Sequence, residues 1–329
     1  MKLAVLGAGA WGTAISISLA ARHAVTLWAR DPQQARELAA ARTNQRYLPG
    51  FAIPDAVFVT AEFAGALAGS ELALIATTTA GLRPTLQRLT AAGNTPPLVW
   101  LCKGFETESA QLPHQVVASE LPAAPQRAVL SGPSFAAEVA RGLPTALTLA
   151  SADSTFAEQA ARELHHERLR IYSSDDVIGV EVAAAVKNVI AIAAGVSDGL
   201  GLGYNARAAL ITRGLAEITR LGLKFGGRLE TFMGLAGAGD LVLTCTGDLS
   251  RNRNVGLQLA RKVALPEVLR SLGHVAEGVY TARAVDRLAR ELGVDMPITR
   301  AVCRVMDENI APREAVQELL QRDPKPEHR

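Results

Sequence analysis

One lysine lies inside a long apolar stretch of the sequence. The segment Val182–Gly195 reads VAAAVKNVIAIAAG, and Lys187 carries its only charge. A buried ammonium is costly unless another group pairs with it. At helical spacing its neighbours are mostly alanines, which leave room for a ligand. The segment predicts either an amine with a lowered pKa that exchanges a proton with a carbonyl or hydroxyl oxygen, or a lysine that snorkels to solvent.

Two later segments also bring polar groups together. Gly234–Asp240 reads GLAGAGD and places a carboxylate at the end of a flexible, glycine-rich turn, with Thr244 four residues further on. Ser250–Asn254 reads SRNRN and concentrates donors suited to a phosphate, because an arginine such as Arg251 can clamp two oxygens in one plane. A solvated loop is the plainer interpretation of this second segment.

The start of the chain carries a glycine-rich turn. Gly7–Gly12 reads GAGAWG, fits the pattern GxGxxG, and lies between the apolar run Lys2–Leu6 and a helix-like segment. In such a βα unit the glycines allow a tight turn and the approach of a pyrophosphate, and the helix N-terminus presents amide hydrogens to the phosphates. This context predicts dinucleotide binding at Gly7, Gly9 and Gly12. A merely tight turn is the alternative.

Cofactor choice depends on the end of the second strand. Arg30 and Asp31 follow the apolar run Ala24–Trp28 there. An acidic side chain at this place accepts the ribose hydroxyls of NAD(H), whereas an arginine pairs with the 2′-phosphate of NADP(H). We expect NADP(H) to be preferred and NAD(H) to be tolerated. An exposed loop arginine without a ligand is the alternative for Arg30.

Alternating strands and helices must position these residues. The first 174 residues alternate short apolar runs with helix-like segments, and such runs fit strands that are buried on both faces. We predict an α/β, Rossmann-type dinucleotide-binding domain over 1–174, with a mostly parallel sheet and helices on both faces. The predicted strands are Leu3–Leu6, Ala24–Trp28, Val57–Thr60, Leu72–Ala76, Leu98–Cys102, Ala128–Ser131, Thr145–Leu149 and Leu169–Tyr172.

Further candidate residues directly follow two of these strands. Lys103 comes after Leu98–Cys102, and Gly132-Pro133-Ser134 follows the next strand. Open α/β sheets bind ligands beyond the carboxyl ends of their strands, so both positions belong to the candidate site.

The second half of the chain shows only helical patterns. We predict an all-helical, substrate-binding domain over 175–322 and a charged, disordered tail over 323–329. Pro266, Pro297 and Pro312 lie near the first turns of three helices, where a missing amide hydrogen costs nothing. The predicted helices cover 176–197, 205–223, 228–233, 254–262, 265–272, 277–292, 297–308 and 312–321.

Composition excludes several classes of protein. The 34 basic and 32 acidic residues leave a net charge of +2 without a basic block, so no nucleic-acid partner is expected. Three distant cysteines lack paired spacing, and we predict no metal site. Glycines interrupt the apolar N-terminus and argue against a signal peptide. The apolar stretch Val182–Val196 is too short for a membrane span, so a cytoplasmic protein is expected.

Together these segments resemble the bacterial NAD(P)-dependent glycerol-3-phosphate dehydrogenase family over essentially the whole chain. The order of the motifs is specific, although no single motif would suffice. They are GAGAWGTA at 7–14, CKG at 102–104, SGPSFAAEVA at 131–140, AVKNVIAIAAGVSDG at 185–199, NARAALITRGLAE at 205–217, GLAGAGDLVLTCTGDLSRNRNVG at 234–256 and EGVYTA at 277–282. Ala10 departs from the family, where many members carry serine, and the lost hydroxyl weakens cofactor binding only modestly.

The resemblance implies reversible reduction of dihydroxyacetone phosphate to sn-glycerol 3-phosphate, with hydride transfer to C2. It implies no metal, a homodimer, and a product that supplies glycerophospholipid synthesis. The implied catalytic residue is Lys187. The implied substrate-binding positions are Lys103, Gly132, Ser134, Asn188, Asp240, Thr244, Ser250, Arg251 and Asn252. The implied cofactor-binding positions are Gly7, Gly9, Ala10, Trp11, Gly12, Arg30, Lys103, Ala136, Arg251, Val275 and Glu277.

Within this set the resemblance also implies separate roles. Arg251 and Asn252 hold the substrate phosphate. Asp240 and Thr244 position the reacting end of the substrate and Lys187, which donates or accepts the proton.

Two other functions fit the same residues. A related two-domain dehydrogenase would keep the fold, the cofactor and the lysine but act on another hydroxy acid or phosphorylated sugar. The donors at 250–252 favour a small phosphorylated substrate. A nucleotide-sensing protein would bind the cofactor without turnover, but it would have little reason to keep Lys187, Lys103 and Asp240 together.

Overall fold

A computed structural model of the chain describes residues 1–93, 95–124, 126–272, 276–308 and 310–323. These residues form two compact units. Unit 1 comprises Met1–Ala184 and Gly226–Asp240, and unit 2 comprises Ala185–Phe225 and Leu241–Arg329. The predicted domain boundary after residue 174 stays a prediction. So does the disordered tail, of which only Asp323 lies among the described residues.

Unit 1 is built on an eight-stranded sheet with the strand order β10-β9-β8-β7-β6-β1-β2-β5. Neighbouring strands are parallel except β8 and β9, which confirms the predicted mostly parallel sheet. All eight predicted strands are present: β1 (Lys2–Leu6), β2 (Ala24–Trp28), β5 (Val57–Thr60), β6 (Leu72–Ile75), β7 (Leu98–Trp100), β8 (Arg127–Ser131), β9 (Thr145–Ala150) and β10 (Leu169–Ser174).

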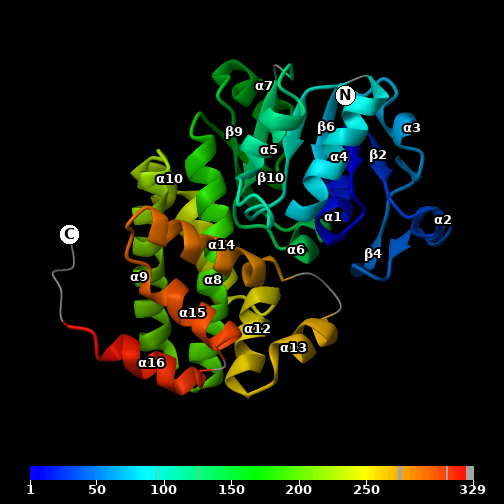
Figure 1. Cartoon of the computed structure of the whole chain (residues 1–329). Helices are drawn as coiled ribbons and strands as arrows, with labels where there is room; N and C mark the ends of the chain where they lie inside the picture. Colours follow the sequence, from blue (N-terminus) through cyan, green and yellow to red (C-terminus); the bar gives the residue numbers. More distant parts are fainter. Residues whose placement is uncertain (94, 125, 273–275, 309, 324–329) are drawn as a thin grey trace. The chain divides into compact units, whose positions relative to one another are not determined.

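Alternate residues of the central strand β1 enter two different cores. Leu3 and Val5 share one core with α1, α2 and α7, whereas Ala4 and Leu6 share the other with α3, α4 and α5. Successive side chains of a strand point to opposite faces, so continuous apolar runs fit a sheet covered on both sides. Figure 1 shows these helices around the blue and cyan strands. Their bounds are α1 (Ala10–Leu19), α2 (Pro32–Ala41), α3 (Phe63–Leu67), α4 (Thr79–Ala92), α5 (Pro113–Glu120), α6 (Ala136–Ala140) and α7 (Ser154–Leu164).

A short hairpin that the sequence patterns did not predict supports the glycine-rich turn. It pairs β3 (Thr43–Asn44) with β4 (Leu48–Ala52) in antiparallel fashion. The buried Asn44 side chain donates to the Ala8 carbonyl oxygen at 3.1 Å and to Thr13 Oγ1 at 2.8 Å. Asn44 therefore ties the hairpin to both sides of the turn.

Unit 2 contains helices and no strand among its described residues, which confirms the predicted helical region. Proline stands in the first turn of α15 and of α16, as predicted. Its helices include most of α8 (Val177–Gly199), with α9 (Gly203–Lys224), α11 (Asp240–Thr246), α12 (Arg251–Ala260), α13 (Leu265–Leu272), α14 (Glu277–Glu291), α15 (Pro297–Asp307) and α16 (Pro312–Leu320).

Helices α8 and α12 approach each other closely through glycines. A Cβ atom at Gly195 would lie 2.0 Å from the Arg253 carbonyl oxygen, and one at Gly256 would lie 2.0 Å from the Ile192 carbonyl oxygen. No larger residue fits at either position without moving a helix. The crossing therefore fixes the register of α12 against α8.

The segment predicted as a flexible glycine-rich turn is helical instead. Leu235–Gly239 forms a π-helical turn that follows α10 (Leu229–Met233) and leads into α11. A Cβ at Gly237 would lie 2.1 Å from the Phe232 carbonyl oxygen, so this glycine permits a tight backbone contact. Glycines usually indicate turns, so the sequence pattern does not reveal the close backbone packing that they permit here.

Helix α8 ends two residues beyond the predicted helix 176–197. Its 23 residues are long and apolar enough to cross a membrane by length and composition alone. However, 83% of its most apolar window is buried inside the protein. Burial of this extent is typical of a core helix.

Candidate functional site

Glycines shape the turn between β1 and α1. Gly7 adopts φ +124°, and a Cβ there would lie 2.8 Å from the Ala76 carbonyl oxygen. A Cβ at Gly12 would lie 1.8 Å from the Gly7 carbonyl oxygen, so only glycine allows the helix to approach the turn this closely. Gly9 differs, because apart from its chain neighbours and its own helix, no described residue has an atom within 4 Å of its Cβ position.

Backbone donors stand beside the open space at Gly9. Gly9 is the N-cap of α1 without a side-chain cap, and the first helical hydrogen bond runs from Thr13 N to its carbonyl oxygen. The amide hydrogens of Ala10, Trp11 and Gly12 therefore precede the helical ladder, at the positive end of the helix dipole. The space and the donors fit a dinucleotide pyrophosphate.

The two candidates for the adenine ribose differ in what they already bind. Asp31 is the N-cap of α2, and its Oδ1 accepts a hydrogen bond from Gln33 N at 2.9 Å. Arg30 is exposed and has no partner among the described residues. The helix cap accounts for Asp31 without a ligand, which keeps Arg30 as the residue predicted to meet a 2′-phosphate.

Unit 1 holds a polar centre around Lys103. Its Nζ lies 2.8 Å from Asp240 Oδ2 and donates to the Gly132 carbonyl oxygen at 3.0 Å. Ser134 Oγ donates to the same carbonyl oxygen at 2.9 Å. Asp240 is 1% exposed, so its charge is compensated inside the protein. Four predicted positions thus meet after β7, after β8 and at the start of α11.

Unit 2 holds a second polar centre around Lys187. The lysine is 5% exposed, so the snorkelling alternative is wrong. Its Nζ donates to Thr244 Oγ1 at 3.1 Å, and Thr244 is itself buried. The buried amine therefore has a hydrogen-bond partner in Thr244, a residue that the family resemblance places beside it.

Asn188 and Asn252 form a short hydrogen-bonded chain in the same unit. Asn252 Oδ1 accepts from Gly278 N at 3.1 Å, and its Nδ2 donates to Asn188 Oδ1 at 2.9 Å. The backbone donor at Gly278 fixes which end of the Asn252 amide is the acceptor. The Asn252 amide nitrogen is thereby oriented as a donor group.

The SRNRN segment is the first turn of α12, so its interpretation as a solvated loop is wrong. Ser250 is the N-cap, and its Oγ accepts from Arg253 N at 3.2 Å. Arg251 is exposed and makes no hydrogen bond or ion pair with a described residue. A helix N-terminus that carries an arginine favours an anion.

The remaining cofactor positions are less informative. Ala136 begins α6, and Glu277 begins α14. Val275 lies outside the described residues. These assignments stay predictions.

Comparison with known proteins decides the family. A family model described as the N-terminus of NAD-dependent glycerol-3-phosphate dehydrogenase matches residues 2–157, and one described as its C-terminus matches residues 176–317. The glycerol-3-phosphate dehydrogenase (NAD(P)+) of Dechloromonas aromatica is 59% identical over 99% of both chains. The chain belongs to the NAD-dependent glycerol-3-phosphate dehydrogenase family.

Other relatives agree with this family. The glycerol-3-phosphate dehydrogenase (NAD(P)+) of Nitrosospira multiformis is 57% identical over 99% of each chain. The crystal structure of glycerol-3-phosphate dehydrogenase from Coxiella burnetii has a TM-score of 0.93 and 44% identity, covering 98% of this chain and 99% of that one. The predicted family is confirmed, and the chain is an NAD(P)-dependent oxidoreductase.

Sequence patterns did not indicate the partners of two further charged residues of this dehydrogenase. Arg253 on α12 pairs with Asp198 at the end of α8, 2.7 Å away. The buried Glu181 contacts Trp100 and His114. A charged residue in an apolar helix was a usable signal for Glu181, as it was for Lys187. The partners of Glu181 lie 67 and 81 residues away along the chain, which local patterns do not reveal.

Proposed function

We propose that this dehydrogenase reduces dihydroxyacetone phosphate to sn-glycerol 3-phosphate with NADPH, or with NADH, in a reversible reaction. The observation that carries the proposal is Lys187, a buried amine that donates to Thr244 beside the Asn188–Asn252 chain. A buried amine among hydrogen-bonding side chains is suited to move a proton at a substrate oxygen. The names of the relatives support the choice of substrate.

The cofactor assignment rests on the turn before α1. In the proposal, the amides of Ala10 and Trp11 hold the pyrophosphate, and Arg30 pairs with the 2′-phosphate of NADPH. The wider proposed set is Gly7, Gly9, Gly12, Lys103, Ala136, Arg251, Val275 and Glu277. Bound NAD(P)H supplies the hydride that reaches C2 of the substrate.

Lys187 balances the charge that develops on the substrate. Its ammonium gives one proton to the oxygen on C2 as the carbonyl becomes a hydroxyl, and the neutral amine takes that proton back in the reverse direction. Thr244 Oγ1 accepts from Nζ and so directs the amine. The α8 backbone holds Lys187 without a flexible loop. A fixed cation beside a growing negative charge lowers the barrier.

Phosphate recognition is assigned to α12 and its N-terminus. Arg251 offers a planar pair of donors, and Asn252 offers an amide whose orientation Gly278 fixes. Ser250 caps the helix, whose positive end favours the phosphate dianion. We assign the other substrate contacts to Lys103, Gly132, Ser134, Asn188 and Asp240.

The cellular role follows from the proposed product. We propose that the protein acts in the cytoplasm as a homodimer and supplies the glycerol backbone of membrane glycerophospholipids. Light scattering of the purified protein should give twice the mass of the chain.

The test is a cofactor oxidation assay. Purified protein is mixed with dihydroxyacetone phosphate and either NADPH or NADH, and loss of the reduced-nicotinamide absorbance is followed. Arg30→Ala should weaken NADPH binding about 10- to 100-fold, the loss of a charge-assisted contact, and leave NADH unchanged. If the protein binds the cofactors but oxidises neither of them, dihydroxyacetone phosphate is not its substrate. A panel of phosphorylated carbonyl compounds would then separate another dehydrogenase from a sensor.

A further inference from the structure

A buried carboxylate that the proposed mechanism does not use lies on the first turns of α8. Glu181 is 2% exposed and belongs to unit 1. Its Oε1 accepts from Trp100 Nε1 at 2.7 Å and from His114 N at 2.9 Å, and its Oε2 lies 2.5 Å from His114 Nδ1. Burial of a carboxylate is costly, an apolar side chain would avoid that cost, and the three contacts compensate it here.

Both partners of Glu181 bracket the segment that carries Lys103. Trp100 is the last residue of β7, three residues before Lys103. His114 stands in the first turn of α5, directly after residues 101–113. One carboxylate therefore holds the entry and the exit of this segment. We call residues 101–113 the Lys103 segment.

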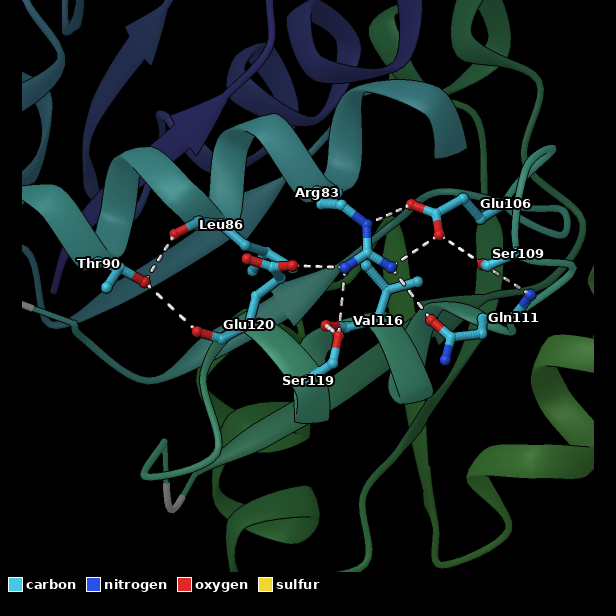
Figure 2. A network of polar contacts seen from close by, with 9 residues as sticks. All are labelled: Arg83, Leu86, Thr90, Glu106, Ser109, Gln111, Val116, Ser119 and Glu120. Carbon is cyan, nitrogen blue, oxygen red and sulfur yellow. Dashed lines mark hydrogen bonds and ion pairs between the residues drawn. The ribbon is translucent and has the colours of Figure 1, made fainter.

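The middle of the Lys103 segment is closed by its own contacts. Glu106 N donates to the Gln111 carbonyl oxygen at 2.9 Å, and Ala110 N donates to the Glu106 carbonyl oxygen at 2.8 Å. Figure 2 shows Arg83 of α4 reaching the same loop through Glu106 and Gln111. These contacts fix the shape of residues 106–111, whereas Lys103 lies outside them, between this loop and the end of β7 that Glu181 holds.

We infer that Glu181 is a positioning residue for Lys103. It places the Lys103 ammonium between Asp240 and the Gly132 carbonyl oxygen by holding both ends of the segment. This inference rests on the proposed role of Lys103 in substrate binding. Among the described residues, the hydrogen-bond partners of Glu181 are Trp100 and His114, and neither is Lys103 or a proposed substrate-binding residue.

Glutamine and leucine at position 181 separate geometry from charge. Gln keeps an oxygen for Trp100 Nε1 and His114 N, and its amide can donate to the Nδ1 of a neutral imidazole. Leu fills the space but accepts nothing, so both ends of the segment are released. Glu181→Gln should retain kcat/KM within about three-fold, whereas Glu181→Leu should lower it about 10- to 100-fold, mainly through a raised KM for dihydroxyacetone phosphate.

A second buried carboxylate provides the matched control. Glu217 is 1% exposed and accepts from Ile298 N at 2.6 Å and from Thr299 N at 3.2 Å, at the start of α15 in unit 2. Neither donor belongs to the proposed site. Glu217→Leu should lower the melting temperature to a similar degree and leave KM unchanged below that temperature.

A double-mutant cycle tests the route through Lys103. If Glu181 acts by placing this lysine, Glu181→Leu should add little to the loss already caused by Lys103→Ala. Full additivity of the two losses would overturn the inference. So would an unchanged KM in Glu181→Leu, or an equal rise of KM in Glu217→Leu.

Hydrogen exchange keeps this test separate from the proposed function. Glu181→Leu should speed amide exchange within residues 101–113, and Glu217→Leu should not. If wild-type protein fails to oxidise NADPH with dihydroxyacetone phosphate, the proposed function fails, and the exchange result still decides whether Glu181 holds the segment. If amide exchange in the Lys103 segment of Glu181→Leu equals that of the wild type, the inference is overturned even in an active enzyme.

Discussion

The two lysines of the candidate site are held in different ways. Lys187 stands in the middle of the 23-residue helix α8, so its position is set by a backbone ladder and by the packing of α8 against α12. Lys103 stands on a loop whose place depends on side chains from β7, α4, α5 and α8. The two lysines should therefore be displaced by different substitutions. Lys187 should be affected by its own replacement or by a change at the α8–α12 crossing, whereas Lys103 should also be displaced by substitutions of side chains that do not contact it.

Replacement of Lys187 should have the largest effect. Lys187→Met keeps an unbranched side chain that is one atom shorter and removes the ammonium that exchanges the proton. We expect kcat to fall about 10²- to 10⁴-fold, with NADPH affinity nearly unchanged, because general acid catalysis by one residue contributes about this much. Steady-state kinetics and fluorescence titration with NADPH measure the two quantities. A mutant with near-normal turnover would show that Lys187 takes no part in the mechanism, and only Lys103 would then remain as a lysine of the site.

Glu217, the buried carboxylate of unit 2, should affect stability and not substrate binding. Burial raises the pKa of Glu217 to about 7, above an ordinary value of 4.5, despite hydrogen bonds from Ile298 and Thr299 that lower it. A raised folded-state pKa stabilises the protein below about pH 4.5, and this contribution is lost as the pH rises to about 7. The free energy of unfolding should fall by up to about 3 kcal/mol from this group.

Glutamine at this position removes the titration and keeps one acceptor. We expect Glu217→Gln to show a smaller loss of unfolding free energy between pH 4.5 and pH 8 than the wild type, by urea denaturation. The KM for dihydroxyacetone phosphate should not change. Equal pH slopes in the two proteins would mean that Glu217 titrates in its ordinary range.

Particular residues show what the sequence could and could not predict. All eight strands of the main sheet were predictable, because continuous apolar runs bounded by turn residues mark strands buried on both faces. Lys187 was predictable because a charge in an apolar helix is rare. The two-residue strand β3 was not predictable. Its role depends on one buried side chain, Asn44, which donates hydrogen bonds to Ala8 and Thr13.

Long-range side-chain contacts explain most of what was missed. The Lys103–Asp240 pair spans 137 residues, and although each residue was a candidate in its own segment, neither segment indicated the other as its partner. Glycines misled the prediction at 234–239, where they permit a π-helical turn rather than a loose one. Local patterns report preferences for turns and helices, but they do not report which backbone atoms a glycine allows to touch.

The helix crossing in unit 2 gives the third prediction. Gly195→Ala adds a Cβ 2.0 Å from the Arg253 carbonyl oxygen, so α8 and α12 must separate. We expect a loss of about 1–3 kcal/mol in unfolding free energy, with a raised KM as the Asn188–Asn252 bond lengthens. Gly65→Ala in α3 is the control, because its Cβ would make an ordinary 3.5 Å contact. An unchanged KM in a destabilised Gly195→Ala would show that the crossing does not orient Asn252.

The smallest expected effect concerns the middle of the Lys103 segment. Arg83 donates through Nε and Nη2 to Glu106, at 2.8 and 2.7 Å, and also pairs with Glu120 (Figure 2). Its side chain is 29% exposed, and such pairs contribute little each. Arg83→Met should therefore raise the KM for dihydroxyacetone phosphate only about two- to five-fold.

Comparison of Arg83→Met with Glu181→Leu decides which contacts place Lys103. The backbone hydrogen bonds between Glu106 and Gln111 remain in Arg83→Met, and Glu181 still holds both ends of the segment. Arg83→Lys should keep the charge but lose the two-point contact with Glu106, so it should resemble Arg83→Met more than the wild type. If Arg83→Met raises KM as much as Glu181→Leu does, the middle of the segment positions Lys103, and the ends merely follow it.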